Sequence, residues 1–329
     1  MTIMLSICIP TFNRAEYLKE CLTSVLLSIA EHEHEIEIVI SDNASADDTG
    51  NIVHAFQDTH PWIRYHRNEQ NIGAERNFYH LAKLAQGENI WIFGDDDIME
   101  VSAVSRVLDN ICAGYDLTIC NYSLWDKQFV VQLKANGLDG EQDQSFDDSN
   151  ALMERFGLHL GYISCVVIKR RLFLKLPSDE YESFTEYGFP FLFAVYYGVA
   201  NDVCNMSYVA ESMLRNRGGN SGDYDWYKYF VTGSSLIFDE LLQTGYTKMA
   251  VCAAKQNVLT SFVIPNMIGM KLRMSRQENS KTLNLLFKYY KHYWQFWVYC
   301  LPITIAPSFL LRLAKNVLKH IRRLNGINS

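Results

Sequence analysis

The first 122 residues alternate between short apolar runs and amphipathic stretches, and this alternation limits the fold more than any other feature of the chain. Residues 4–9 (MLSICI) have the pattern of a buried strand, and apolar side chains over residues 17–29 recur at helical spacing. The same patterns predict further strands at residues 36–40, 63–66, 90–93 and 117–121, with helices between them. Strands separated by helices of this length predict an α/β fold with a mostly parallel, doubly wound sheet.

The rest of the chain divides into a mixed region and a helical region. A polar, acidic stretch over residues 125–150 predicts a boundary or an insertion near residue 122. Beyond it the patterns predict a strand at 162–169, a helix at 187–199, a strand at 203–209, a glycine-rich loop at 215–222, and helices from there to the end. We therefore expect one domain over residues 1–222, with halves 1–122 and 123–222, and a helical region over 223–329.

Charge is distributed unevenly along the chain. The net charge of −7 argues against a nucleic-acid binder, whose basic surface should dominate the total. No acidic residue follows Glu278, whereas eight basic ones do, which leaves 22 of the 30 basic residues to face all 37 acidic ones. These eight are Lys281, Lys288, Lys291, Arg312, Lys315, Lys319, Arg322 and Arg323. An acidic body with a basic tail predicts docking on a negative surface, with a membrane as the first candidate.

The tail also carries apolar and aromatic residues. Trp294 to Leu311 is uncharged, but Gln295, Pro302 and Pro307 interrupt it, so a membrane-spanning helix is disfavoured. The aromatic residues are typical of an interfacial belt: Tyr289, Tyr290, Tyr293, Trp294, Trp297 and Tyr299. We predict peripheral attachment to the anionic inner face of the cell membrane; the alternative is a helical subdomain whose aromatic residues pack on protein.

The cysteines and the amino terminus predict a cytoplasmic location. The eight cysteines are scattered, without a C-x-x-C pair, and mostly lie in apolar runs, as buried thiols do. The apolar run at residues 4–9 ends at once in Pro10 and lacks the features of a signal peptide.

Polar motifs follow three of the predicted strands, where an open parallel sheet binds its ligands. They are PTFNR at residues 10–14, SDNAS at 41–45 with Asp47 and Thr49 behind it, and GDDD at 94–97. A carboxylate such as Asp42 can accept a hydrogen bond from a base or ribose, and adjacent carboxylates suit a hard divalent cation that bridges two phosphates. G-x-G-x-x-G and G-x-x-x-x-G-K-[ST] are both absent, which argues against a dehydrogenase and a P-loop NTPase.

Together with Asn71-x-Gly73 and Arg76-Asn77, these motifs resemble the family 2 glycosyltransferases, which have a GT-A fold built on one nucleotide-binding sheet. The four motifs cover about the first third of the chain, and RGGNS at residues 217–221 is similar to a late donor-side loop of such domains. The motif wording is most similar to the bacterial abequosyltransferase-like branch, which adds dideoxyhexoses to O-antigen repeat units. On this resemblance residues 1–122 are the nucleotide half and 123–222 the acceptor half.

The resemblance implies a role for each motif residue. The predicted nucleotide-sugar contacts are Pro10, Thr11, Asn13, Asp42, Arg76 (on the diphosphate), Asp95 and Arg217, and the predicted ligands of Mn²⁺ or Mg²⁺ are Asp96, chiefly, and Asp97. One position departs from the family: Gly94 stands where most members have the first carboxylate of Asp-x-Asp-Asp, and Asp95 could compensate. Without the resemblance, residues 95–97 could simply cap the next helix and Arg76 could form a surface ion pair.

The resemblance also implies a general base at the start of a helix in the acceptor half, commonly in a Glu-Asp pair. Glu186 is the best positional match, although Tyr187 replaces the second acid, so Asp179, Glu180 and Glu182 remain rivals. The base would take a proton from the attacking hydroxyl.

The predicted function is transfer of one sugar from a CDP-, UDP-, GDP- or dTDP-linked donor to a hydroxyl of a lipid-linked bacterial glycan, with inversion. The alternative is an inactive nucleotide-sugar-binding scaffold, motivated by Gly94 and the incomplete Glu-Asp pair. A nucleotidyltransferase is disfavoured, because no glycine- and lysine-rich phosphate loop follows the first strand.

Overall fold

The fold is taken from a computed structural model, which describes residues 3–29, 32–200, 202–219, 225–313 and 315–316. The strands are β1 (Leu5–Thr11), β2 (Ile36–Asp42), β3 (Arg64–Arg67), β4 (Asn89–Ile92), β5 (Ile98–Met99), β6 (Leu117–Trp125), β7 (Gln132–Lys134), β8 (Gln144–Phe146), β9 (Val166–Lys169) and β10 (Met206–Arg217). The α-helices are α1 (Ala15–Ile29), α2 (Thr49–Thr59), α3 (Ala74–Leu84), α4 (Ala103–Cys112), α5 (Ser149–Phe156), α6 (Arg170–Phe173), α7 (Ser178–Ser183), α8 (Pro190–Val199), α9 (Ser234–Leu241), α10 (Lys248–Asn257), α11 (Ile264–Lys271), α12 (Arg276–Tyr290) and α13 (Leu301–Ile305). Short 3₁₀ segments are η2 (Gly157–Gly161), η3 (Ile163–Cys165) and η5 (Leu242–Thr244), and π-helical segments are η4 (Lys228–Gly233), η6 (Val258–Val263) and η7 (Phe296–Cys300).

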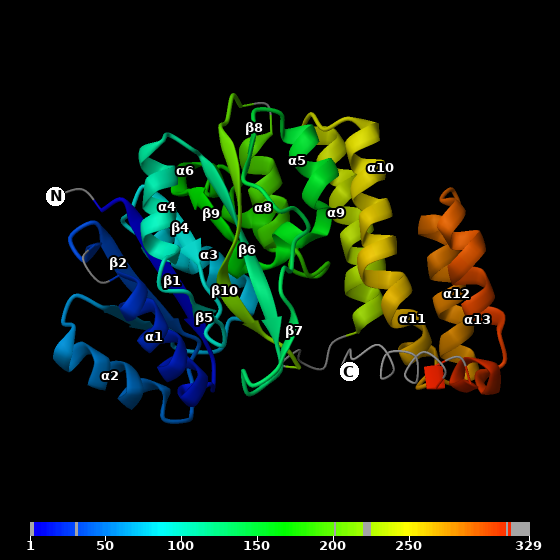
Figure 1. The fold of residues 1–329 in the computed structure, drawn as a ribbon, viewed down its shortest axis with the longest axis horizontal. Coiled ribbons are helices and arrows are strands. Elements are labelled where there is room, and N and C mark those ends of the chain that lie inside the picture. The colour runs from blue at the N-terminus through cyan, green and yellow to red at the C-terminus, as the bar shows by residue number, and fades with distance from the viewer. Residues whose placement is uncertain (1–2, 30–31, 201, 220–224, 314, 317–329) are drawn as a thin grey trace.

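One sheet runs through the molecule in the order β3-β2-β1-β4-β9-β6-β10-β5, with β7 and β8 added at β6 and β10 (Figure 1). Its amino-terminal part is parallel, with Thr11 opposite Asp42 and Cys8 opposite Ile92. The carboxyl ends of β1, β2 and β4 therefore lie at one edge, which confirms the predicted α/β architecture. β9 enters antiparallel between β4 and β6, a reversal that the sequence pattern did not predict.

Alternation along β1 assigns its side chains to two cores. Leu5, Ile7 and Ile9 pack with residues of α1 and α4, while Cys8 faces the larger core that contains α3 and α8. A sheet buried on both faces explains why β1 and β2 are apolar nearly throughout.

Several predicted boundaries differ from the structure. The loop predicted to begin at residue 215 is wrong at its start, because β10 continues to Arg217 through its pairing with β6. The strand predicted at 162–169 begins only at Val166, after the 3₁₀ turn η3, and the helix predicted from 187 begins at Pro190. The polar stretch at 125–150 supplies the strands β7 and β8. Residues 220–222 lie outside the described residues.

The carboxyl-terminal helices extend away from the edge that carries α1 and α2 (Figure 1). Ile237 and Phe238 of α9 and Val251 of α10 are buried in the same core as α8. The boundary at residues 222 and 223 stays a prediction. Within the described part of the chain, no helix is both long and apolar enough to cross a bilayer.

Candidate active site

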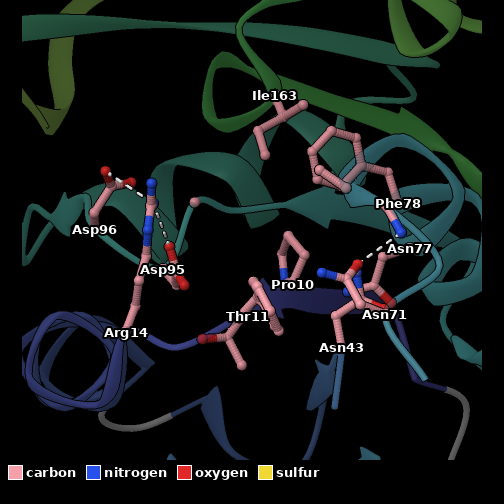
Figure 2. A pocket seen from close by; sticks show the side chains of 14 residues that line it. Pro10, Thr11, Arg14, Asn43, Asn71, Asn77, Phe78, Asp95, Asp96 and Ile163 are labelled. Carbon is pink, nitrogen blue, oxygen red and sulfur yellow. Dashed lines mark hydrogen bonds and ion pairs between the residues drawn. The ribbon is translucent and has the colours of Figure 1, made fainter. Parts of the chain in front are cut away.

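A cavity of about 440 Å³ opens where β1 and β4 end (Figure 2). Its wall contains residues of all four sequence motifs: Pro10, Thr11, Phe12, Arg14, Asn43, Asn71, Gly73, Ala74, Asn77, Phe78, Gly94, Asp95, Asp96 and Ile163. Parallel strands bring these distant motifs together, as expected for the ligand crevice of an open α/β sheet. Of the predicted residues, Pro10, Thr11, Asp95 and Asp96 line this cavity.

Asn13 joins the segments that follow β1 and β2. Its backbone N–H donates to Ser45 Oγ at 2.8 Å, and its Oδ1 accepts from the N–H of Ala46 at 2.7 Å. Its φ of 52° is in the left-handed region, which asparagine tolerates better than most residues. In this structure Asn13 shapes the rim without lining the cavity, and its predicted nucleotide contact stays a prediction.

Asp42 is buried behind the cavity and already has partners. Oδ1 accepts from the N–H of Ser45 at 2.8 Å, and Oδ2 accepts from the Tyr65 hydroxyl at 2.7 Å and lies 3.4 Å from Arg67 Nε. Burial, and then the hydrogen bond to Asp42, raises the pKa of Tyr65. A direct contact between Asp42 and a base would compete with these bonds.

Asparagine side chains occupy the wall beside Asp42, and the sequence analysis gave them no roles. Asn43 Nδ2 donates to Asn71 Oδ1 at 2.7 Å, and Asn43 Oδ1 accepts from the N–H of Ile72 at 2.9 Å. Asn77, buried on α3, accepts from Ser41 Oγ at 2.6 Å and donates to Ser41 O at 3.0 Å. The motifs do contain these three asparagines, so the sequence offered a hint of their role. Asparagine is equally common as a turn former, however, and the sequence alone does not separate the two roles.

Arg14 lies between the first two carboxylates of the acidic triplet (Figure 2). Its Nη1 is 3.0 Å from Asp95 Oδ1 and 3.2 Å from Asp96 Oδ2. Burial raises the pKa of Asp95 to about 6, against the opposing effect of Arg14. Arg14 was part of a quoted motif but was not predicted as a site residue; only the fold shows that it reaches the end of β4.

Asp97 is turned into the protein. Its Oδ2 accepts from the hydroxyls of Tyr162 and Ser164, both at 2.6 Å, and its Oδ1 accepts from Asn216 Nδ2 at 3.2 Å and the N–H of Arg217 at 3.4 Å. Burial and the neighbouring Asp96 raise the pKa of Asp97 to about 7. As a metal ligand Asp97 would have to give up these donors, so that role stays a prediction.

The same contacts explain the glycine at position 94. A Cβ there would lie 2.9 Å from Asp97 Oδ2, 3.2 Å from Ser164 Oγ and 3.3 Å from Asp96 Oδ1. The backbone N–H of Gly94 also donates to Ser164 Oγ at 2.8 Å. A carboxylate at this position would crowd the bonds that hold Asp97.

The donor set at the cavity suits a divalent ion whose other ligands come from a diphosphate and water. Asp96 lines the cavity with a partly exposed carboxylate, and Asp95 lies beside it. The described residues contain no group of three or more metal-ligating side chains. A Mg²⁺-like ion is commonly held by one or two carboxylates together with substrate phosphates, so these residues fit one.

Arg217 is buried behind the triplet. Nε donates to Asp96 O at 2.9 Å, Nη1 donates to Lys127 O at 2.7 Å, and Nη2 pairs with Glu20. The guanidinium carbon lies 4.6 Å from the Tyr17 ring centroid and 4.2 Å from that of Phe129. The predicted contact of Arg217 with the nucleotide-sugar donor stays a prediction. The contacts described here give Arg217 a structural role.

Arg76 and Glu186 both lie outside the wall of this cavity. Arg76, near the start of α3, is exposed and forms an ion pair with Glu182 of α7 at 2.8 Å. Glu182, one of the alternative candidates for the general base, is therefore already paired with Arg76. Glu186 is exposed on the turn between α7 and α8. The structure does not test either predicted role.

Comparisons with known proteins agree with this geometry. The family model described as glycosyl transferase family 2 matches residues 6–176, more than half of the chain. The chain therefore belongs to glycosyl transferase family 2. It is 27% identical to abequosyltransferase RfbV of Salmonella typhimurium over 66% of this chain and 67% of that protein. It is 28% identical to a GalNAc(5)-diNAcBac-PP-undecaprenol beta-1,3-glucosyltransferase of Campylobacter jejuni, over 46% of this chain and 48% of that protein.

Solved structures share the fold at lower identity. S. aureus TarS, solved in complex with UDP-GlcNAc, aligns with a TM-score of 0.64 at 17% identity, over 87% of this chain and 80% of that chain. The mannosyltransferase PcManGT from Pyrobaculum calidifontis, in complex with GDP-Man and Mn²⁺, aligns with a TM-score of 0.54 at 12% identity, over 99% of this chain and 84% of that chain. The predicted GT-A fold is confirmed.

Proposed function

We propose that this protein transfers one sugar from a nucleotide-diphosphate sugar to a hydroxyl of a lipid-linked bacterial surface glycan. The cavity carries the proposal, because it places the end of β1, the asparagine wall and the Asp95–Asp96 carboxylates around one volume. Names of relatives add support: one is an abequosyltransferase, and the other's name includes a PP-undecaprenol glycan. The nucleotide base of the donor, the transferred sugar and the acceptor are to be identified by experiment.

In the proposed reaction, Asp96 would hold Mn²⁺ or Mg²⁺ at the cavity, with Asp95 beside it. When bound, the ion neutralises negative charge on the departing diphosphate. Arg14 provides a second positive charge at the same place, 3.0 Å from Asp95. Pro10 and Thr11 also line the cavity, and Asp42 orders the turn that carries Asn43.

The acceptor side supplies the base in this proposal. Glu186 accepts the proton of the acceptor hydroxyl as its oxygen attacks the anomeric carbon, and the nucleoside diphosphate leaves from the opposite face. Direct displacement inverts the configuration at that carbon. Glu186 is exposed on its turn, so its side chain is open to solvent and to an acceptor.

A thermal-shift panel tests donor binding. CDP, UDP, GDP and dTDP, and sugars linked to each, are measured with Mn²⁺, with Mg²⁺ and with chelator. A ligand at 100 times its dissociation constant adds about 2.7 kcal/mol of stability, a readily measured shift. We expect one base to stabilise the protein in a metal-dependent way; no shift from any nucleotide would refute the proposal.

Hydrolysis of the selected donor separates an enzyme from a scaffold. An enzyme should release free sugar and nucleoside diphosphate slowly without an acceptor, whereas a scaffold should bind without release. Two features make this control worthwhile: Gly94 departs from the family's metal motif, and Asp97, which matches that motif, is hydrogen-bonded inside the protein.

We further propose that the carboxyl-terminal helices dock on an anionic membrane. Large apolar side chains are exposed there: Phe287, Trp294, Trp297, Val298, Tyr299, Ile305, Phe309, Leu310 and Leu313. Exposed basic residues accompany them: Lys281, Lys288, Lys291, Arg312 and Lys315. Tyr290 of the predicted aromatic belt is instead buried in the core, and Lys319, Arg322 and Arg323 lie outside the described residues. Exposed aromatic side chains accompanied by basic ones are typical of interfacial binding.

Vesicle co-sedimentation tests the membrane proposal. We expect binding to phosphatidylcholine vesicles that contain phosphatidylglycerol, and weaker binding to vesicles of phosphatidylcholine alone. The paired change Trp294→Ser with Trp297→Ser should reduce binding. Val101→Ser, at another exposed apolar residue far along the chain, is the control and should not. Equal binding by both variants would contradict the proposal.

A further inference from the structure

We propose that a second cavity, between α3, the turn at residues 184–188 and η4, binds a sugar ring of the acceptor, with the Glu75 side chain as its polar anchor. This inference rests on the proposed function and locates one of its substrates. The cavity measures about 340 Å³ and is lined by Ala74, Glu75, Thr185, Gly188, Phe189, Tyr229 and Phe230. Ala74 also lines the first cavity, so the two are adjacent.

Glu75 carries the argument because one oxygen of its carboxyl group is buried without a partner among the described residues. Its Oε2 is fully buried and accepts no hydrogen bond from any residue that the structure describes. Burial raises the pKa of Glu75 to about 8, so near neutral pH the group is a carboxylic acid that can both donate and accept. A buried polar group without a partner is costly, and such exceptions call for a functional explanation.

The opposite wall is built from aromatic side chains that pack on one another. Phe230 stacks on Trp226 with ring centroids 4.8 Å apart and on Phe262 at 5.6 Å. Phe189 meets Phe230 edge-on at 5.6 Å. A largely apolar, aromatic lining with a few polar groups is typical of small-ligand sites, and it suits a sugar ring with a C–H face and hydroxyl edges.

Two glycines hold this wall in place. Gly188 has a φ of +86°, and a Cβ there would lie 1.8 Å from Tyr229 Cδ1. A Cβ on Gly233 would lie 1.9 Å from Tyr187 O. The π-helical segment η4 therefore packs directly against the 184–188 turn, which carries Glu186, and π-helical turns occur frequently at functional sites.

Direct binding of simple glycosides tests the inference. The probes are methyl glycosides of glucose, galactose, mannose, rhamnose and N-acetylglucosamine, measured by saturation-transfer NMR with the full chain. We expect at least one to bind the wild type and its dissociation constant to rise about tenfold in Glu75→Leu, as expected for loss of a buried hydrogen bond. Glu75→Gln, whose amide also donates and accepts, should stay within about threefold of wild type.

Controls separate this role from a structural one. Glu88→Gln changes an exposed carboxylate at the opposite end of β4 and should leave glycoside binding unchanged. Glu75→Leu should be at least as thermally stable as wild type, because an apolar side chain replaces an unpaired buried acid. Unchanged glycoside binding in Glu75→Leu, or no glycoside binding by the wild type, would overturn the inference.

The nucleotide panel on the same preparation distinguishes the two proposals. Nucleotide binding and donor hydrolysis with glycoside binding that does not depend on Glu75 would leave the proposed function standing and overturn the sugar subsite. Glycoside binding that depends on Glu75, without any nucleotide binding, would support the subsite and refute the glycosyltransferase proposal.

Discussion

Replacing Arg217 by alanine should destabilise the protein strongly, because this charged residue is buried at the end of β10. The Arg217 side chain is only 4% exposed and makes two hydrogen bonds to backbone carbonyls, an ion pair with Glu20 and two ring contacts. A hydrogen bond to a charged group contributes about 1.5–3 kcal/mol, and a cation–π contact about 0.5–2 kcal/mol. Since these terms are not additive, we expect Arg217→Ala to cost about 3–5 kcal/mol.

The matched control lies two residues earlier on β10. Arg215 also pairs with a carboxylate, that of Glu100, and lies over a ring, but its side chain is 40% exposed. Arg215→Ala should therefore cost only about 0.2–1 kcal/mol. Arg217→Lys should fall between the two, because it keeps the charge and loses the planar fork.

Urea unfolding measures both costs from the change in midpoint at constant slope. Because Arg217 Nε holds the carbonyl of Asp96, Arg217→Ala should also weaken the metal dependence of nucleotide binding, and Arg215→Ala should not. A cost for Arg217→Ala below about 1 kcal/mol, within the range of a surface ion pair, would refute this account of a buried structural arginine.

Three further changes test other parts of the site. Asp96→Asn should abolish the metal-dependent thermal shift with nucleotide and lower transfer by at least about a hundredfold, since the metal is worth several kcal/mol; retained metal dependence would exclude Asp96 as the chief ligand. Asn77→Ala should cost about 1–3 kcal/mol in urea unfolding, because it leaves buried groups of Ser41 unpaired, and a neutral effect would contradict the asparagine wall. Between pH 4.5 and about 8 folded Glu75 keeps a proton that the unfolded chain has lost, so stability should fall as pH rises, by at most about 1.4 kcal/mol per unit. Glu75→Gln should lack this component, whereas Glu88→Gln should keep it, and parallel pH profiles for Glu75→Gln and wild type would contradict a raised pKa. Tyr181 is a titratable neighbour, because its hydroxyl donates to the backbone carbonyl of Glu75, and it is left unchanged in both variants.

Hydrophobic periodicity determined the amino-terminal half of the fold. β1, β2 and β4 are nearly continuous apolar runs and the helices between them have apolar residues at a spacing of 3.6, and the motifs mark where each strand ends. Because the carboxyl ends of parallel strands share one edge, the positions of Pro10, Thr11, Asp95 and Asp96 around one cavity could be predicted from the chain alone.

Only the tertiary structure decided which motif side chains face the cavity. Asp97 and Arg217 are chemically suited to bind a metal or phosphate, but contacts with residues far along the chain hold both inside the protein. Conversely, Arg14 reaches Asp95 and Asp96 across more than eighty residues, a pairing with no local signature.

The region beyond β6 depended on tertiary packing even more. β9 reverses direction inside the sheet, and the π-helical segment η4 closes against the 184–188 turn through Gly188 and Gly233. Glu75 has the sequence appearance of an ordinary acid in the first turn of a helix, where aspartate and glutamate are common. Its burial depends on elements from the far half of the chain, so sequence alone determined the helix and its motif, and the packing of that half decided what the carboxyl group faces.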